Sequence, residues 1–541
     1  MNIENVQYEQ LPADLAVSDN SRKLIEECAH LYCNHYGNWS KNAPYAPGKR
    51  IKLSADKIQK CWLGNKDANL YTARLETLIG YAIAIRSKYP DELYSVNDKY
   101  GVFSWVTQLV VHEDYRKRGI AKRLLFSIWG QSDDFAWGVL TANPYAIRAL
   151  EKATRRRCSP ERISKNKTKL FNIACEDLGD CYEINKGSTQ IEVNKTGSKI
   201  DTKFFVDHSQ VPEMIKKAAS NGTPWVLGDI EEGWEWFAFT FNDQDQLKLT
   251  KDEVQGMIDT SDQVAKHAYS RMLLNEGHNW SKHTKKEIDF IIEKCGLMPG
   301  KTVLDMGCGK GRHALALAEK GLQVTGVDYV SAFIENARQE ARKKNLKTVK
   351  FSVDDGRKIE LGQDYDAVIC LYDVIGSFID EKENKKILAN IARSLKPGGI
   401  AIITVLNYEL TIHLAQTQSP RHVFSFDSDP NKVLDLAPAE IMEKTGNIFD
   451  PAHYLVDEKT HIVYRNEQFT VGGRLPEQLI VMDKRYTKKE ITDLCEQVGL
   501  KVQWAKYVGA GKWRDSLNPT ENAAKEIMVF CEKHVSASHQ G

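Results

Sequence analysis

Residues 303–312 read Val-Leu-Asp-Met-Gly-Cys-Gly-Lys-Gly-Arg, and this stretch decides the fold of the chain around it. The apolar run over 302–304 predicts a strand, the alternate glycines predict a turn, and a helix is expected from about Arg312. Glycine lets the backbone approach a ligand closely and adopt conformations that a Cβ would block. A helix that begins there presents unpaired backbone N–H groups, which suit an anionic or electron-rich ligand. The stretch therefore predicts a ligand site at a strand–turn–helix junction.

The spacing of the glycines distinguishes between nucleotide cofactors. A dinucleotide site has the pattern G-x-G-x-x-G, with an acid about 20 residues further on. Here the pattern is G-x-G-x-G, Arg312 stands where the third glycine would be, and Asp328 ends the next apolar run. This pattern resembles motif I of the class I S-adenosylmethionine (SAM) methyltransferases. The resemblance implies that the turn wraps the amino-acid end of SAM and that Asp328 holds its ribose hydroxyls; the alternative is a glycine-rich turn in another doubly wound domain.

The chain that follows favours the methyltransferase interpretation. Residues 349–355 predict a third strand that ends at the family's adenine-binding position, and 365–371 form the nearly continuous apolar run of a strand buried on both faces. A Pro-Gly-Gly helix stop leads into a fifth strand over 400–406. Strands thus alternate with helical stretches, which is typical of a parallel, Rossmann-like α/β sheet. The helical stretches are 313–320, 331–344 and 381–395.

The resemblance implies a set of cofactor contacts in this domain. In the family, helices upstream of the first strand cover SAM, and an aromatic or basic residue there often reaches the cofactor carboxylate. The SAM-binding residues implied are Asp305, Gly307, Cys308, Gly309, Gly311, Asp328, Tyr329, Asp354, Asp355, Gly356, Leu371, Tyr269 and Arg271.

Composition indicates the general class of protein. A chain of 541 residues is long enough for two or three domains, each with its own core. A net charge of +1 gives no overall basic field for nucleic acid. The 11 cysteines are scattered without a C-x-x-C pair, which favours a reducing compartment over disulfides or a zinc site. The first residues do not resemble a secretory signal, and no apolar run approaches the ~18 residues of a membrane span. We therefore expect a cytoplasmic enzyme without a metal or a membrane partner.

A second strand–turn–helix stretch lies nearer the start of the chain. It comprises a strand over 105–111, the turn Arg-Lys-Arg-Gly-Ile-Ala over 116–121, and an amphipathic helix from about Ile120. The turn matches the R/Q-x-x-G-x-G/A loop of the GNAT acyltransferases, whose backbone N–H groups hold the pyrophosphate of acetyl-CoA. The resemblance implies acetyl-CoA or another acyl-CoA as a second cofactor. Its implied contacts are Leu109, Val110, Val111, Arg116, Lys117, Arg118, Gly119, Ile120, Ala121, Lys122 and Asn143.

One position departs from the GNAT pattern. Residues 143–152 resemble the family's N-x-x-A-x-x-L-Y-E-K helix, but the tyrosine that often protonates the departing CoA thiolate is replaced by Leu150, which has no proton to donate. Tyr145 could supply the proton, the thiolate could leave unassisted, or the domain could bind acyl-CoA without catalysis. His112 and Glu113 are candidates for deprotonating an attacking amine, although surface positions explain both equally well.

These patterns predict a domain map. A GNAT fold, with a mixed sheet flanked by helices, is expected over 1–185, and a connecting, aromatic-rich β segment over 186–260. A class I methyltransferase domain is expected over 261–541, with an insertion over 407–480 that forms a lid on the acceptor site.

The combined prediction is a bifunctional group-transfer enzyme that methylates, and also N-acylates, a small metabolite or natural-product intermediate. After the fourth strand the chain reads Tyr372-Asp-Val-Ile-Gly rather than Asn/Asp-Pro-Pro-Tyr, which disfavours an adenine or glutamine N-methylase. The alternative is an RNA- or protein-modifying methyltransferase whose GNAT domain is a non-catalytic scaffold. The Lys/Arg-rich segment 152–169 would then contact nucleic acid, a partner that the sequence does not favour. The methylated atom and the oligomeric state are not indicated.

Overall fold

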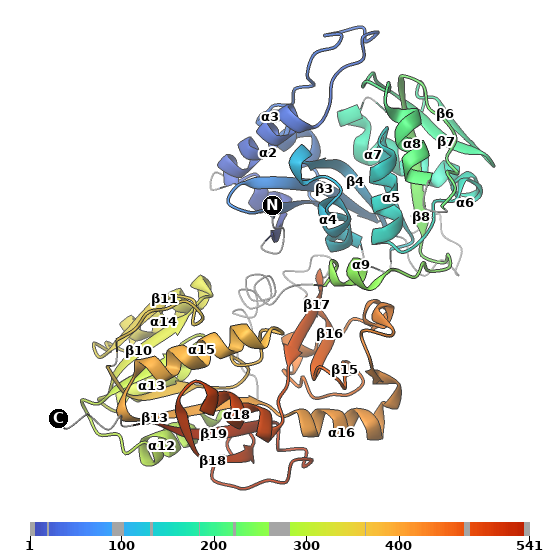
Figure 1. The fold of residues 1–541 in the computed structure, drawn as a ribbon. Helices are drawn as coiled ribbons and strands as arrows, with labels where there is room; N and C mark the ends of the chain where they lie inside the picture. Colours follow the sequence, from blue (N-terminus) through green and yellow to red (C-terminus); the bar gives the residue numbers. More distant parts are fainter. Residues whose placement is uncertain are drawn as a thin grey trace, which may run out of the picture. The chain divides into compact units, whose positions relative to one another are not determined.

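The computed structural model describes residues 6–18, 21–88, 102–129, 132, 134–182, 184–219, 223–258, 282–362, 364–469 and 477–534. The chain divides into two compact units, Met1–Met257 and Ile258–Gly541 (Figure 1). Each unit builds its own sheet and covers it with its own helices. No helix within the described ranges is long and apolar enough to cross a membrane.

The first unit is built on an eight-stranded sheet in which every described pair of neighbours is antiparallel except β4 and β5. In spatial order the strands are β1 (Gln7–Pro12), β2 (Ala68–Arg74), β3 (Leu78–Lys88), β4 (Val102–Val111), β5 (Ala136–Thr141), β8 (Gly233–Phe241), β7 (Gly197–Phe204) and β6 (Ile191–Asn194). The helices are α1 (Ala13–Ala16), α2 (Arg22–His35), α3 (Ala55–Lys57) with the π-helix Ile58–Trp62, α4 (Ile120–Trp129), α5 (Pro144–Ala153), α6 (Pro160–Lys165), α7 (Lys167–Tyr182), α8 (Val211–Ala219) and α9 (Lys251–Gln255).

Residues 186–260, which were expected to connect two domains, contribute the strands β6, β7 and β8 to this sheet. β8 pairs with β5 over Ala136–Thr141, and β7 and β6 follow at the sheet edge. The aromatic side chains of β8 are therefore buried within the first unit, where Phe239 contacts Trp105 with ring centroids 4.7 Å apart. Structurally, residues 191–241 belong to the first unit.

The parallel pair β4 and β5 is joined over only part of its length. Pairing runs from Phe103↔Ala136 to Val106↔Val139, while β4 continues to Val111. Beyond Val106 the two strands no longer pair, although each still pairs with its outer neighbour. The middle of the sheet is therefore open at this end.

The second unit is a doubly wound α/β domain. Its seven-stranded sheet has the order β11-β10-β9-β12-β13-β19-β18, and β19 is the one strand of this described sheet that runs opposite to the others. The strands are β9 (Thr302–Met306), β10 (Gln323–Asp328), β11 (Val349–Val353), β12 (Tyr365–Cys370), β13 (Leu395–Leu406), β18 (Leu500–Val508) and β19 (Glu526–Lys533). The helices around it are α12 (Thr284–Lys294), α13 (Arg312–Glu319), α14 (Ser331–Lys343), α15 (Glu381–Ser394) and α18 (Lys488–Gln497).

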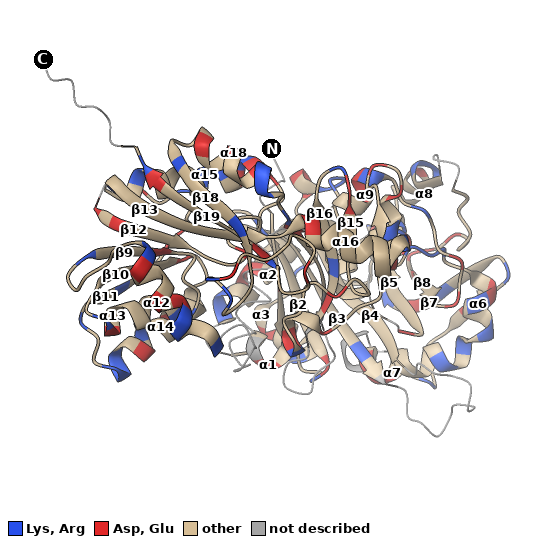
Figure 2. Ribbon diagram, turned by 90° about the horizontal axis from the view of Figure 1, so that it is seen from below, with Lys and Arg blue, Asp and Glu red and all other residues tan. Residues whose placement is uncertain are grey.

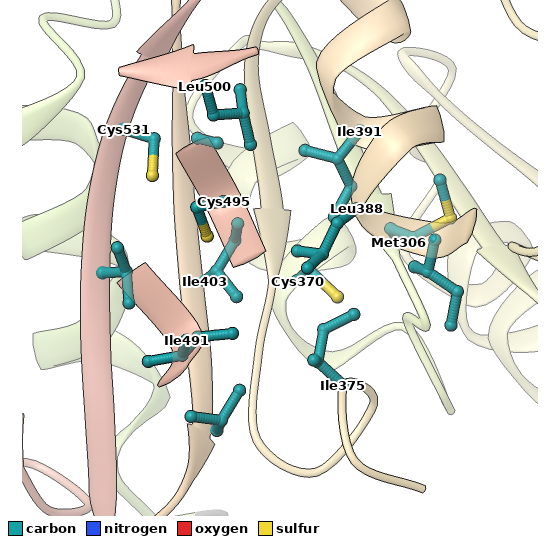
Figure 3. Close-up of a cluster of buried hydrophobic side chains, with 14 of the residues drawn as sticks. Met306, Cys370, Ile375, Leu388, Ile391, Ile403, Ile491, Cys495, Leu500 and Cys531 are labelled. Carbon is teal, nitrogen blue, oxygen red and sulfur yellow. The ribbon is translucent and has the colours of Figure 1, made fainter. Parts of the chain in front are cut away.

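Both faces of this sheet are covered, which explains its continuous apolar strands. On one face Leu304 of β9 belongs to a core with residues of α15 and α18, and Figure 3 shows Ile391 and Cys495 of these helices beside Ile403 of β13. On the other face, Val303 packs with residues of α12, α13 and α14. The predicted Rossmann-like sheet is confirmed. The fifth strand begins earlier than expected, at Leu395, because Leu395 pairs with Tyr365 ahead of an irregularity in the ladder.

The region expected as a lid forms a small structure of its own. It contains α16 (Tyr408–Gln418), α17 (Ile441–Lys444) and a four-stranded sheet of β14 (Val423–Phe424), β15 (Leu455–Asp457), β16 (Ile462–Phe469) and β17 (Glu477–Lys484). The sheet encloses an ion network in which Asp483 is the centre. Its carboxylate accepts hydrogen bonds from Arg465 and from Arg485, the latter at 2.8 Å, and Arg465 also reaches Glu467 at 2.9 Å. All four side chains are at most 7% exposed.

Charged residues of both signs alternate over the helices of both units (Figure 2). In the Lys/Arg-rich segment 152–169, Arg155 and Arg156 are buried and hydrogen-bonded to Gln246 and Asn242. Arg157 donates to the buried Glu151. Three consecutive arginines of this segment are thus engaged within the first unit.

Replacing Asp483 by Asn should destabilise the second unit by about 3 kcal/mol, because two buried guanidinium groups lose their shared anion. Urea unfolding followed by circular dichroism measures the change. Asp493→Asn is the matched control, because Asp493 pairs with Lys489 on the exposed face of α18 and its loss should not shift the transition. Equal effects of the two substitutions would contradict a structural role for the buried network.

Candidate functional site

The glycine turn after β9 has three residues in the left-handed region. The φ angles of Gly307, Gly309 and Gly311 are 76°, 54° and 78°. A Cβ on Gly307 would lie 2.4 Å from Val374, and one on Gly311 would lie 2.7 Å from Phe351, so these two glycines allow segments of the protein to pack together. A Cβ on Gly309 would meet no atom within 4 Å. Gly309 is therefore the glycine of the turn that faces open space, where a ligand could approach the backbone.

Asp328, at the end of β10, is fixed by the same turn. One carboxylate oxygen accepts the N–H of Gly309 at 2.9 Å and the other accepts the N–H of Val330 at 2.9 Å. Burial raises the pKa of Asp328, although both hydrogen bonds act to lower it. The backbone carbonyl of Asp328 accepts the N–H of Asp354, at 3.0 Å, so the ends of β10 and β11 are held side by side. Tyr329 follows Asp328 and is half-buried.

Asp305 lies inside the domain instead of at the sheet edge. It is 2% exposed, and its Oδ2 has no hydrogen-bond partner in the described part of the chain. Burial raises its pKa to about 7, partly offset by the charge of Arg312 and by a hydrogen bond from the N–H of Ala314. Asp305 therefore contacts the start of α13 from the interior of the domain, through the N–H of Ala314. Cys308 of the glycine turn is also buried.

The end of β11 presents one apolar and one acidic side chain to solvent. Val353 is 46% exposed and Asp354 is exposed. Asp355, in contrast, is engaged by Arg357, whose Nη2 lies 2.8 Å from its carboxylate. A Cβ on Gly356 would come within 3.0 Å of the Met306 sulfur, so this glycine permits close packing against β9.

A buried carboxylate joins the turn to the chain beyond β12. Glu287 of α12 is 0% exposed and accepts hydrogen bonds from Arg312 at 2.6 Å, His313 at 3.0 Å and the Tyr372 hydroxyl at 2.8 Å. Burial acts to raise the pKa of Glu287, but the bond from His313 and the charge of Arg312 outweigh it and lower the pKa to about 2. Burial lowers the pKa of His313 to about 4, so its ring is neutral at physiological pH. The predicted contact Leu371 is buried beside Tyr372, whose φ is 67°.

Two further carboxyl groups lie at the carboxyl edge of the sheet. Asp373 follows Tyr372 in the loop after β12, and burial raises its pKa. Glu526, the first residue of β19, is 4% exposed, and burial raises its pKa to about 8. Thr404 accepts the backbone N–H of Tyr372 and hydrogen-bonds to Glu526, so it links the two segments.

In the first unit, the predicted acyl-CoA loop is an exposed turn that leads into α4. Lys117 has a φ of 61° and lies 5.7 Å from the Tyr145 ring, and Gly119 has a φ of 87° with no atom within 4 Å of its would-be Cβ. The Arg116 side chain donates to the backbone carbonyls of Val111 and His35, so it fixes the turn to the end of β4.

The other predicted acyl-CoA contacts surround this turn. Lys122 donates to the Glu253 carbonyl at 3.1 Å, and burial lowers its pKa. Asn143 caps α5 by accepting the N–H of Tyr145 at 2.9 Å. Arg118 is exposed and Ile120 is buried. The remaining predicted contacts are Leu109, Val110 and Val111 in β4 and Ala121 in α4.

The residues considered for catalysis in the first unit fall into two groups. The rings of His112 and His35 are 3.8 Å apart, and Glu113 approaches His35, so these three lie together at the end of β4. Tyr145 lies beside the loop, whereas Leu150 is fully buried. Nothing in the helical pattern around His35 marks it as a site residue, so it could not be found from the sequence.

A second group of buried polar atoms in this unit was also missed. Glu235 of β8 is 2% exposed, and its Oε2 lacks a hydrogen-bond partner among the described residues, as does the Tyr81 hydroxyl. Burial raises the pKa of Glu235 to about 7. Burial, and then the charge of Glu235, raise the pKa of Tyr36. Glu235 lies in the aromatic-rich β segment expected over 186–260, and a lone acid within such a segment gives no signal of its own.

Tyr269 and Arg271, predicted to cover the cofactor, lie outside the described residues. Among the described ones, the structure brings together Gly309, Asp328 and Asp354 at the ends of β9, β10 and β11. Sequence reasoning missed Glu287, His313 and Glu526, whose roles depend on contacts between distant segments.

Comparisons with known proteins identify this part of the chain. Residues 303–399 match the model of a methyltransferase domain. The ubiquinone biosynthesis O-methyltransferase of Rickettsia felis is 30% identical over 183 residues, which cover 30% of this chain and 72% of that relative. The glycine/sarcosine N-methyltransferase of Halorhodospira halochloris is 28% identical, over 31% of this chain and 58% of the relative. A solved SAM-dependent methyltransferase from Clostridium acetobutylicum shares 17% identity with a TM-score of 0.34, covering 50% of this chain and 97% of its own.

The chain therefore belongs to the SAM-dependent methyltransferases, and its methyl donor is SAM. The N-terminal GNAT fold, acyl-CoA binding and the individual contact residues stay predictions.

Gly309→Ala should weaken SAM binding at least about tenfold, because its methyl group would occupy the open space that the turn presents. Gly296→Ala is the matched control: its φ is 59° and its would-be Cβ also meets nothing within 4 Å. Both variants incur about 1 kcal/mol of left-handed strain. Calorimetric titration with SAM measures the difference, and equal affinities would place the ligand elsewhere.

Replacing Glu526 by Gln should change how stability depends on pH. The pKa of Glu526 is about 8 in the folded protein against an ordinary value of 4.5, so the folded state holds a proton that the unfolded state releases above pH 4.5. The stabilising contribution of the protonated form is complete below pH 4.5 and is lost as the pH rises through 8. Glu526→Gln should therefore raise the free energy of unfolding by on the order of 5 kcal/mol at pH 9 and leave it unchanged at pH 4. Urea titrations at both pH values measure this, and a pH-independent difference would contradict it.

Proposed function

We propose that the chain is a bifunctional group-transfer enzyme that methylates, and N-acylates, a small metabolite or natural-product intermediate. The methyltransferase part follows from the family. The acceptor, the binding residues and the acyl transfer are the proposal.

The arrangement around Gly309 supports the proposed SAM contacts. Gly309 offers open space next to the Asp328 carboxylate, which could accept hydrogen bonds from the two ribose hydroxyls. The exposed Val353 and Asp354 at the end of β11 suit a flat base with a polar edge. When bound, SAM supplies an electrophilic methyl group, and the protein mainly has to hold an acceptor in line with it.

The small lid supports a small-molecule acceptor. The end of β17 contacts the loop after β12, because the Lys484 N–H donates to the Gly376 carbonyl at 2.7 Å. A Cβ on Gly376 would lie 2.3 Å from the Lys484 carbonyl, so this contact is close. The lid sheet therefore stands next to the carboxyl edge of β12, where ligands bind in open α/β sheets, and limits its access to solvent.

The open end between β4 and β5 supports acyl transfer by the first unit. Strands that separate beyond Val106 leave room for an acyl chain, and the N-terminus of α4 behind the turn suits a pyrophosphate. Glu235, near the middle of the same sheet, is a buried carboxyl that could take a proton from an amine. Leu150 remains the departure from the family pattern, so proton donation to the thiolate would fall to Tyr145 or to solvent.

The acyl-transfer half is tested by thiol release from acetyl-CoA in the presence of a panel of amines. The expected result is thiol release by the wild-type chain and at least tenfold weaker acetyl-CoA binding by Gly119→Ala, whose methyl group would crowd the turn. Gly48→Ala is the control, since Gly48 has a φ of 71° and an equally open Cβ direction in the same unit. Binding without thiol release would indicate an acyl-CoA scaffold, and no binding would remove the acyl-CoA proposal.

A further inference from the structure

The side chain of Glu526 lies where a methyl acceptor would be expected. β19 runs antiparallel to β13, so its first residue pairs with Leu406, the last residue of β13. This places Glu526 at the carboxyl edge of the sheet, where ligands of open α/β domains bind. Because β13 separates β19 from β12, and adjacent strands lie about 4.8 Å apart, Glu526 stands about 10 Å beyond β12, on the side away from the glycine turn.

Glu526 is buried with one oxygen unused. It is 4% exposed, and within the described chain its Oε2 accepts no hydrogen bond. Thr404 hydrogen-bonds to the carboxyl group, and the backbone N–H of Tyr372 donates to Thr404 in turn. A buried carboxyl with a free oxygen is unfavourable unless a donor or a cation is placed against it. The hydrogen bond with Thr404 holds one side of the carboxyl group and leaves Oε2 for a donor from a ligand.

Two carboxyls at this position form no ion pair within the described chain, although the charges of Arg465 and Arg485 act on Asp373 and those of Arg312 and Lys525 act on Glu526. Arg312 is paired with Glu287, and Arg465 and Arg485 share the anions of the lid network. These three cations are matched by Glu287, Glu467 and Asp483. Asp373 and Glu526 remain. The charge of Asp373 acts to raise the pKa of both Glu526 and Asp328. With Lys525 counted, the carboxyl groups still outnumber the cations on the acceptor side of the cofactor residues, so the edge can take up one more cation.

We propose that the methyl acceptor is an amine, and that Glu526 and Asp373 bind its ammonium form and accept its proton. This inference rests on the proposed methyl transfer to a small molecule and specifies the acceptor atom. A carboxylate acceptor already carries negative charge, and a hydroxyl acceptor acquires it on deprotonation; two carboxyl groups beside that charge disfavour both by like-charge repulsion.

The cation that binds beside Glu526 first displaces to solvent the proton that the free protein holds there. The ammonium then passes one of its own protons to the resulting carboxylate, which becomes a carboxylic acid again. The freed lone pair forms the new N–C bond as the methyl C–S bond breaks, and the electron pair of that bond stays on sulfur. The sulfonium thereby becomes a neutral thioether, and the positive charge moves to the methylated nitrogen.

The test uses the full chain, methyl-labelled SAM and the small-molecule extract of cells that express the protein. Mass spectrometry and NMR then identify the labelled product. We expect an N-methyl product, and pretreatment of the extract with an amine-blocking acid anhydride should abolish it. An O- or C-methyl product would overturn the inference while leaving methyl transfer intact. No labelled product from protein that binds SAM would instead overturn the methyl transfer on which the inference rests.

Substitutions of Glu526 then test its role in binding the amine. Glu526→Gln should lower kcat/KM for the extract's amine about 100-fold, mainly through KM, and leave SAM affinity by calorimetry unchanged. Glu526→Asp should restore part of the activity, because it keeps the carboxyl group. Glu532→Gln is the control, since Glu532 lies at the opposite end of the same strand, paired with Ile400. Unchanged kcat/KM in Glu526→Gln, or a loss of SAM affinity instead, would overturn the assignment.

Discussion

A single buried carboxylate, that of Glu287, joins three segments that are far apart in the sequence. It accepts hydrogen bonds from Arg312 and His313 at the start of α13 and from Tyr372 after β12. A buried ion group of this kind is stable only when each lone pair has a partner, so the three donors must be held in place together. The positions of the glycine turn and of the loop that carries Asp373 therefore depend on Glu287.

The buried carboxyl groups of the second unit are of two kinds, those whose oxygens all have partners and those with an oxygen left without one. Glu287 and the lid network around Asp483 are fully paired, and they fix the backbone on either side of the carboxyl edge. Glu526 has an oxygen without a partner among the described residues, and burial keeps its proton bound up to about pH 8. Such a group weakens the fold when it ionises, a cost that is common at functional sites. The paired carboxyls thus serve structure. Asp305 also has an oxygen without a partner among the described residues, but it lies inside the domain, whereas Glu526 stands at the carboxyl edge, and that position points to a ligand.

Much of the second unit follows from short-range patterns. Apolar runs gave the strands β9, β10, β11 and β12, which the structure confirms. The number of strands in the first unit, and so its extent along the chain, was harder to predict. The segment over 186–260 was expected to be rich in β structure, but the pairing of its strand β8 with β5 joins residues about 100 positions apart, which no local pattern encodes.

The sequence by itself determined that a glycine turn stands between β9 and α13, because a backbone with φ of 54° to 78° favours glycine, and three alternate glycines supply that conformation without the strain that a side chain adds. It also determined the family, since the order of turn, acids and strands along the chain is local information. Only the tertiary structure decided that Asp305 faces the interior and that Asp355 is engaged by Arg357. It also decided that Glu526 lies at the carboxyl edge of the sheet, two strands away from β12. These roles depend on burial and on partners from distant segments, and a carboxyl in the sequence looks the same whether its charge is paired or left for a ligand.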